Sequence, residues 1–147
     1  MNNFMVNKAT EYLRNNGING WLIADYNQSN PIFERITGNE TSNITRPIWI
    51  WITSLSEPQI LVHEVDIVHL DSDFNVESYG SRTQMIDKLN NYVKGKTGNA
   101  PLIAMEYSNE FQLPQISKVS AGVIELIASL GAEIISSADL LQYVTET

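Results

Sequence analysis

The stretch IWIWIT, residues 48–53, is apolar at nearly every position. Successive side chains of an extended chain point to opposite faces, so Trp49 and Trp51 would share one face and Ile48, Ile50 and Ile52 the other. A strand with two apolar faces is typical of the middle of a sheet that has helices above and below it. The stretch therefore predicts the α/β class, with a mixed β-sheet and helices on both faces.

The segments around this strand alternate between helical and extended patterns. Apolar residues at helical spacing predict helices over residues 5–16, 31–36, 85–93, 116–130 and 138–144, with Ser137 as the cap of the last one. Short apolar runs predict strands over residues 21–24, 59–63, 76–79, 102–107 and 133–136, of which 59–63 would pair antiparallel with 48–53. No repeat or linker interrupts the pattern, so residues 1–147 are expected to form one domain.

Charge and composition limit the possible partners. Seventeen acidic residues oppose nine basic ones, which gives a net charge of −8 and argues against a nucleic-acid partner. The chain has no cysteine, its start MNNFMVNKATEYL does not resemble a signal peptide, and PIWIWITSL is too short to span a bilayer. We therefore expect a cytoplasmic protein that has no membrane partner.

The stretch ILVHEVDIVHLDSD, residues 60–73, places two histidines among four carboxylates. In an extended chain, His63 and His69 would lie up to about 20 Å apart. In a helix, their spacing of six residues would place the two rings on different sides, unlike the spacing of four in zinc peptidases. The pattern favours a histidine at a strand end and a surface histidine, and we expect no metal site.

Two acidic residues come at the carboxyl ends of predicted strands. Asp25 follows residues 21–24 and Glu106 lies near the end of residues 102–107. Open α/β sheets bind ligands at this edge, so the two carboxylates are candidate ligand-binding residues. The alternative is that both are ordinary solvated acids at strand ends.

No pattern of catalytic residues emerges from the sequence. None of the serines lies in a nucleophile elbow, and neither histidine has neighbours that mark it as a base. Trp49 and Trp51 could line a ligand pocket, although tryptophans that alternate along a central strand also suit a core. The sequence thus predicts no catalytic residue in this chain.

Several segments, taken in order, resemble the N-terminal domain of the creatinase, prolidase and aminopeptidase P family. They are GWLIADYNQSNPIFERITG (20–38), TRPIWIWI (45–52), PQILVH (58–63) and AMEYSNEFQLPQISKVSAGVIELIASLGAEIISSADLLQYV (104–144). The most specific pieces are residues 20–31, AMEYS at 104–108 and SLGAEIISSADL at 129–140, which resemble a bacterial branch of Xaa-Pro peptidases.

The resemblance implies a mixed sheet with helices on both faces, built around a ribonuclease H-like motif. It places the chemistry in a following catalytic domain of the pita-bread fold. There, two divalent metal ions (Mn, Co or Zn) are held by two Asp, one His and two Glu, and a bridging hydroxide attacks the bond before proline. The sequence stops three residues after Val144. That catalytic domain is therefore expected to be absent from this chain, which would be part of a larger enzyme.

For this chain, the resemblance implies roles in dimer formation and in the wall of the substrate pocket. In creatinase, the loop before the second strand reaches the neighbouring active site, where an aromatic residue and an arginine two positions later touch substrate. That arginine corresponds to Arg46, a candidate substrate contact in trans, while the aromatic position holds Ile44. Arg46 could equally be a solvated loop charge.

Two hypotheses follow from the sequence. The first is a non-catalytic N-terminal domain of a metal-dependent Xaa-Pro dipeptidase or aminopeptidase P-like hydrolase, inactive by itself and lacking a metal site. Its partners would be its own C-terminal catalytic domain and a second copy in a homodimer. The second hypothesis is a free-standing α/β ligand-binding or regulatory module that uses Asp25 and Glu106.

Overall fold

The structure, a computed structural model, describes residues 1–71, 73–94 and 99–145. Its helices are α1 Asn3–Asn15, α2 Ile32–Thr37, α3 Arg82–Val93, α4 Ala121–Ser129 and α5 Ala138–Thr145. Its strands are β1 Gly20–Asp25, β2 Ile48–Thr53, β3 Ser56–His63, β4 Val76–Tyr79, β5 Leu102–Met105 and β6 Glu133–Ser136. Three short 3-10 helices are also present in these ranges: η1 Ile67–His69, η2 Asn109–Phe111 and η3 Pro114–Ile116.

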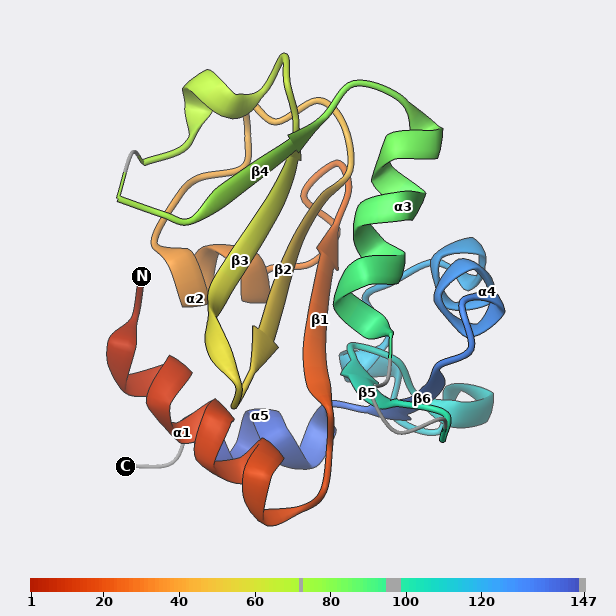
Figure 1. The fold of residues 1–147 in the computed structure, drawn as a ribbon. Helices are drawn as coiled ribbons and strands as arrows, with labels where there is room; N and C mark the ends of the chain where they lie inside the picture. The colour runs from red at the N-terminus through yellow and green to blue at the C-terminus, as the bar shows by residue number, and fades with distance from the viewer. Residues whose placement is uncertain (72, 95–98, 146–147) are drawn as a thin grey trace.

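Within the described ranges, the strands form one six-stranded sheet in the order β4-β3-β2-β1-β5-β6 (Figure 1). β2 pairs antiparallel with β1 and with β3, which confirms the predicted pairing of residues 48–53 with 59–63. The pairs β1 with β5, β3 with β4 and β5 with β6 are parallel. The sheet is therefore mixed, and the carboxyl ends of five of its strands meet at one edge.

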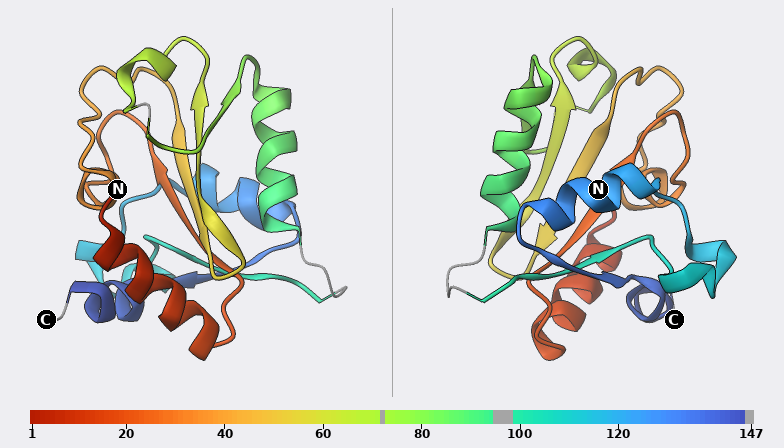
Figure 2. Two further views of the ribbon diagram at one scale, coloured as in Figure 1. Left: turned by 60° about the vertical axis from the view of Figure 1, so that its left-hand side comes forward. Right: turned by 90° about the vertical axis from the view of Figure 1, so that its right-hand side faces the viewer.

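Each face of the sheet carries its own hydrophobic core. Ile48, Ile50 and Ile52 pack with residues of α1, α2 and α5, whereas Trp49 and Trp51 pack with residues of α3 and α4. Figure 2 shows α1 and α3 on opposite sides of the strands. All six residues of β2 are buried, because helices cover both of its faces. The predicted fold class is confirmed, as is the division of this strand into a tryptophan face and an isoleucine face.

The glycine after the first helix ends it as the sequence pattern predicts. Gly17 has a φ of 65°, in the left-handed region that favours glycine. The backbone N–H of Ile18 then donates to the carbonyl of Leu13 at 3.0 Å. The chain thereby turns directly from α1 into β1.

The helix predicted over residues 116–130 is wrong at its start. Ile116 lies in η3, and α4 begins at Ala121. Ser120 is the N-cap of α4, with its hydroxyl accepting a hydrogen bond from the backbone N–H of Val123 at 3.4 Å. The apolar spacing continues before Ser120, so the sequence pattern predicted a helix that begins too early. The strand predicted over residues 102–107 is also shorter, because β5 ends at Met105.

None of the helices in the described ranges combines the length and the apolar run that a bilayer crossing requires.

Candidate functional site

Glu106 lies directly after β5, at the edge where the parallel strands end. The residue has an exposure of 0%, and its carboxylate accepts three hydrogen bonds. The donors are Trp21 Nε1 at 2.8 Å, Asn30 Nδ2 at 2.7 Å and the Ser137 hydroxyl at 2.7 Å. These donors come from β1, from the segment before α2 and from the segment before α5. One buried side chain thus joins three parts of the chain.

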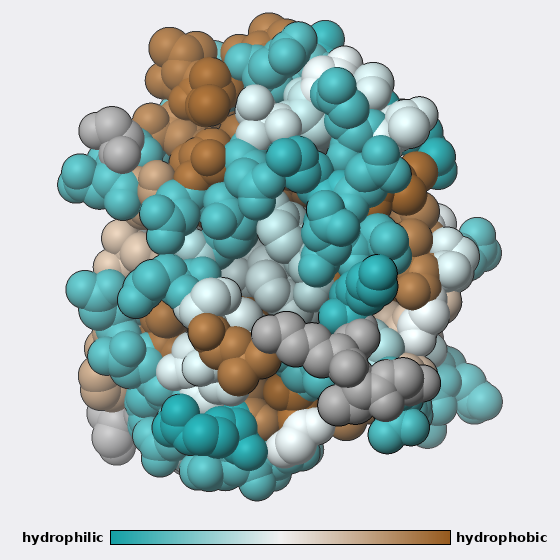
Figure 3. Space-filling model, in the orientation of Figure 1, coloured by the Kyte–Doolittle hydropathy of each residue, from teal (hydrophilic) through white to brown (hydrophobic). Residues whose placement is uncertain are grey.

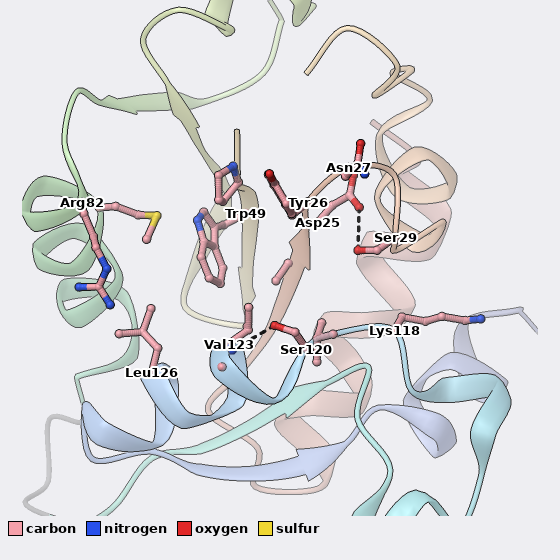
Figure 4. Close-up of a pocket in the computed structure, with 15 residues that line it drawn as sticks. Asp25, Tyr26, Asn27, Ser29, Trp49, Arg82, Lys118, Ser120, Val123 and Leu126 are labelled. Atoms are coloured by element: carbon pink, nitrogen blue, oxygen red, sulfur yellow. Dashed lines mark hydrogen bonds between the residues drawn. The ribbon is translucent and has the colours of Figure 1, made fainter. Parts of the chain in front are cut away.

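Asn30 connects Glu106 to Asp25. Its side-chain nitrogen donates to Glu106 and to the carbonyl of Ala24, while its backbone N–H donates to Asp25 Oδ1 at 2.9 Å. The Ser29 hydroxyl reaches the same Asp25 oxygen at 3.5 Å (Figure 4). The structure therefore brings the two predicted ligand-binding residues, Asp25 and Glu106, to the same edge. Both are buried rather than solvated acids, with Asp25 at 3% exposure.

Burial raises the pKa of both carboxyl groups. It raises the pKa of Glu106 above its ordinary value of 4.5, against the effect of the three hydrogen bonds that the group accepts. It also raises the pKa of Asp25 above 3.8, against the effect of hydrogen bonds from Asn30 and Ser29. Both oxygens of Glu106 accept hydrogen bonds inside the fold, whereas the bonds to Asp25 both reach Oδ1.

A pocket of about 570 Å³ lies beside Asp25, on the face of the sheet that α3 and α4 cover (Figure 4). This volume is within the usual range for small-molecule sites. Its lining includes Asp25, Trp49, Arg82 and Val123, whereas Glu106 lies outside it. Trp49 thus belongs both to the core and to the wall of a pocket, the two possibilities that the sequence pattern left open.

The loop at one side of this pocket has an unusual backbone. Asn27 and Gln28 follow one another in the left-handed region, with φ values of 57° and 62°. This conformation is uncommon outside glycine, and Asn adopts it more readily than Gln does. The hydrogen bonds from Ser29 and Asn30 to Asp25 close the loop on its own strand end. Its shape is therefore held by Asp25.

Arg46 does not line this pocket and lies in the loop before β2. Asp66, at 2% exposure, accepts hydrogen bonds from the backbone N–H groups of Thr45 and Arg46 at 3.0 and 3.1 Å. The Arg46 side chain is exposed, and its guanidinium donates to the Thr45 hydroxyl at 3.0 Å. Ile44 is buried in the core, so it does not project from the loop as a substrate-touching aromatic residue would.

The two histidines occupy the positions that the sequence predicts. His63 ends β3, accepts a hydrogen bond at Nδ1 from the backbone N–H of Val65, and packs edge-on against Tyr79 with ring centroids 5.2 Å apart. His69 is exposed in η1. In the described ranges, no three His, Cys, Asp or Glu residues gather where they could hold a metal ion.

Sequence reasoning missed four partners at this end of the sheet. Trp21 and Asn30 were not singled out as binding partners of Glu106, and Ser137 was expected only as a helix cap. Asp66 was counted among the acids of the histidine stretch. One local signal existed for Asn30, because an Asn before Pro31 commonly starts a turn. The other three have long-range partners that no local pattern marks.

No protein-family model matches the chain, and no curated protein matches it. Solved structures do resemble it. The prolidase from Pyrococcus horikoshii OT3 has 20% identity and a TM-score of 0.65 over 93% of this chain and 33% of its own. The creatinase/prolidase N-terminal domain of an X-Pro dipeptidase from Streptococcus pyogenes has 14% identity and a TM-score of 0.67, over 97% and 98%. The X-Pro aminopeptidase from Thermotoga maritima MSB8 has 18% identity and a TM-score of 0.64, over 92% and 34%.

The chain therefore has the fold of creatinase/prolidase N-terminal domains, and the resemblance expected from its sequence is confirmed at the level of the fold. It spans nearly the whole of the excised domain from Streptococcus pyogenes and about a third of the prolidase from Pyrococcus horikoshii.

Proposed function

We propose that this chain is the non-catalytic N-terminal domain of a metal-dependent Xaa-Pro dipeptidase or aminopeptidase-like hydrolase. One observation carries the proposal: the fold matches a domain that occurs by itself in one solved structure and as a third of a whole prolidase in another. Its first partner would then be a C-terminal catalytic domain. The two divalent ions and their Asp, His and Glu ligands would belong to that domain.

Two measurements test this proposal. Sequencing the gene past codon 147 is expected to show an open frame that encodes the Asp, Asp, His, Glu and Glu ligands of the catalytic domain. The purified 147-residue chain is expected to cleave no Xaa-Pro dipeptide, because its described residues supply no metal centre and no nucleophile with a base. A natural stop codon at this point, or turnover that persists after trace peptidase is removed, would contradict the proposal.

We also propose that the chain contributes to a dimer through an apolar patch beside Arg46. The η1 patch consists of Val65, Ile67 and Val68, which have exposures of 55%, 45% and 76%. Asp66, between them in sequence, fixes the backbone of Arg46. Figure 3 shows apolar surface at the end of the molecule where Figure 1 draws η1. An exposed apolar patch next to an exposed arginine suits a protein interface, and a second subunit bound there would bring Arg46 toward the substrate site of that subunit.

Replacing Val68 by glutamate is expected to weaken self-association by roughly tenfold, because a charge would be buried in the interface. Sedimentation equilibrium over a range of protein concentrations measures this change. Leu55→Glu is the matched control, since Leu55 has 77% exposure and lies in the turn between β2 and β3, at the other end of these strands. Equal weakening by both variants, or a wild-type chain that stays monomeric throughout, would contradict the proposed interface.

The second hypothesis, a free-standing ligand-binding module, is supported by the pocket beside Asp25. Its volume of about 570 Å³ and its lining suit a small ligand. Glu106 gives this hypothesis less support, because it lies outside the pocket and its carboxylate already accepts hydrogen bonds from three donors. The gene sequence past codon 147 separates this hypothesis from the first one.

A further inference from the structure

Trp49, which lines the pocket beside Asp25, carries a buried hydrogen-bond donor that lacks an acceptor among the described residues. Trp49 lines the pocket and has only 2% exposure, yet no described residue accepts a hydrogen bond from its indole Nε1. By contrast, Nε1 of Trp21 donates to Glu106 at 2.8 Å. A buried donor without a partner costs about 1–3 kcal/mol, so such groups in folded proteins commonly have a specific role. An acceptor on a bound molecule would remove this cost.

Most of the remaining wall is apolar. Ala24, Pro47, Met85, Val119, Val123 and Leu126 line the pocket. Figure 4 shows the indole of Trp49 projecting from β2 into the space between α3 and α4, with Val123 and Leu126 facing it from α4. This surface suits an apolar body, for which Trp49 Nε1 would be a single orienting contact.

A cation lies on the α3 side of the same pocket. Arg82 is the first residue of α3 and is exposed, and its guanidinium makes no side-chain hydrogen bond or ion pair with the residues that the structure describes. Figure 4 shows Arg82 at α3 and Trp49 between Arg82 and Asp25, whereas the Lys118 side chain extends away from the pocket. On a chain with a net charge of −8, a guanidinium and an indole N–H that both belong to the lining of one pocket and lack acceptors on described residues suit an anion.

Asp25 does not oppose an anion at this position. Its carboxylate is turned toward Ser29 and Asn30, which both donate to Oδ1 (Figure 4). In the view of Figure 4, this carboxylate lies on the opposite side of the pocket from Arg82. The negative charge of Asp25 and the guanidinium of Arg82 therefore lie at different ends of one cavity.

We propose that this pocket binds a small carboxylic acid with an apolar body. The carboxylate would accept a hydrogen bond from Trp49 Nε1 and pair with Arg82, while the apolar body would pack against Met85, Val123 and Leu126. This proposal is independent of the proposed peptidase role, because it uses only residues of the pocket. A chain that is part of a larger enzyme and a free-standing module would both carry the site.

The test uses 4-phenylbutyrate as the probe and 4-phenyl-1-butanol as its uncharged analogue. The three tryptophans of the chain give three indole N–H signals in a ¹H–¹⁵N spectrum, and Trp49→Phe identifies the signal of Trp49 by its loss. Titration with 4-phenylbutyrate is expected to shift the Trp49 signal in a saturable way and to leave the Trp21 signal in place. The alcohol is expected to bind roughly tenfold more weakly, because it lacks the charge.

Arg82→Gln separates the charge contact from the apolar contact. This exposed substitution is expected to weaken 4-phenylbutyrate binding roughly fivefold and to leave binding of the alcohol unchanged. Arg14→Gln is the control, because Arg14 is an exposed arginine of α1, which packs on the opposite face of the sheet.

Three results would overturn the proposal. The first is a Trp49 signal that does not move with either probe up to about 10 mM, a concentration at which even weak ligands bind. The second is equal affinity for the acid and the alcohol, or equal effects of Arg82→Gln and Arg14→Gln. The third is a Trp49 signal that moves with protein concentration in the absence of probe, since this would show that a second copy of the chain fills the pocket.

Discussion

Replacing Glu106 by alanine is expected to lower the free energy of unfolding by about 3 kcal/mol. The carboxylate is fully buried and accepts hydrogen bonds from Trp21, Asn30 and Ser137. Alanine would leave the indole N–H and the hydroxyl without this acceptor, while Asn30 would keep its bond to the carbonyl of Ala24. Urea unfolding followed by far-ultraviolet circular dichroism measures the change.

Glu133→Ala is the control for this substitution. Glu133 is exposed at the start of β6, the strand next to β5, so its loss is expected to change the free energy of unfolding by less than about 0.5 kcal/mol. Similar losses for the two variants would show that the hydrogen bonds of Glu106 contribute nothing measurable.

The pH dependence of the free energy of unfolding provides a second test of the role of Glu106. Burial raises its pKa in the folded state, so the folded chain keeps the proton to a higher pH than the unfolded chain does. The resulting stabilisation is complete below the ordinary value of 4.5 and is lost as the pH rises through the folded pKa. Wild-type stability should therefore fall, relative to Glu106→Gln, as the pH rises above about 4.5. Parallel curves for the two proteins would contradict this expectation.

Replacing Gly20 by alanine is expected to lower the free energy of unfolding by about 2–3 kcal/mol. A Cβ atom at this position would lie 2.1 Å from the Trp51 ring, far inside van der Waals contact. The ring has little room to move, because Trp51 has only 8% exposure and stacks on Tyr92 at 6.5 Å between centroids. The first residue of β1 is thus a glycine because a tryptophan of β2 covers it. Urea unfolding measures the loss.

Gly122→Ala is the matched control. Nothing lies within 4 Å of a Cβ at Gly122, which is in the first turn of α4, so alanine there is expected to stabilise the chain by about 0.5–1 kcal/mol. A second comparison uses Trp51→Val, which removes the ring. If the clash with Trp51 is the cause, Gly20→Ala should cost much less in that background. An undiminished cost would assign the effect to the backbone of Gly20 instead.

Local pattern predicted most of the helices and strands. The alternation of Trp49 with Ile48 and Ile50 placed β2 in the interior of the sheet, and the stop at Gly17 placed the end of α1. These features depend on neighbours a few residues apart. Prediction failed at α4, because the apolar residues Ile116 and Val119 continue the helical spacing although the chain there is not an α-helix. Spacing along the chain does not distinguish such residues, of which Ile116 is buried in η3 and Val119 is partly buried against the Trp49 face of the sheet, from the residues of a helix.

The candidate site was predicted only in part. The sequence pattern placed Asp25 and Glu106 at the carboxyl ends of strands, the edge where open α/β sheets bind ligands, and both residues lie at that edge. Their surroundings were not predictable, because the partners of Glu106 are 85, 76 and 31 residues away along the chain. The same holds for Asp66, whose partner Thr45 is 21 residues away.

Sequence alone determined the α/β class, the two-sided burial of residues 48–53 and the position of acids at strand ends, because side-chain period and burial are properties of short segments. Only the tertiary structure decided that Trp21 and Asn30 enclose Glu106, and that Trp49 and Arg82 share a pocket. Those outcomes require β1 to lie between β2 and β5, so that loops distant in sequence meet at one edge. Strand order is a property of the whole sheet, and no segment of this chain carries it by itself.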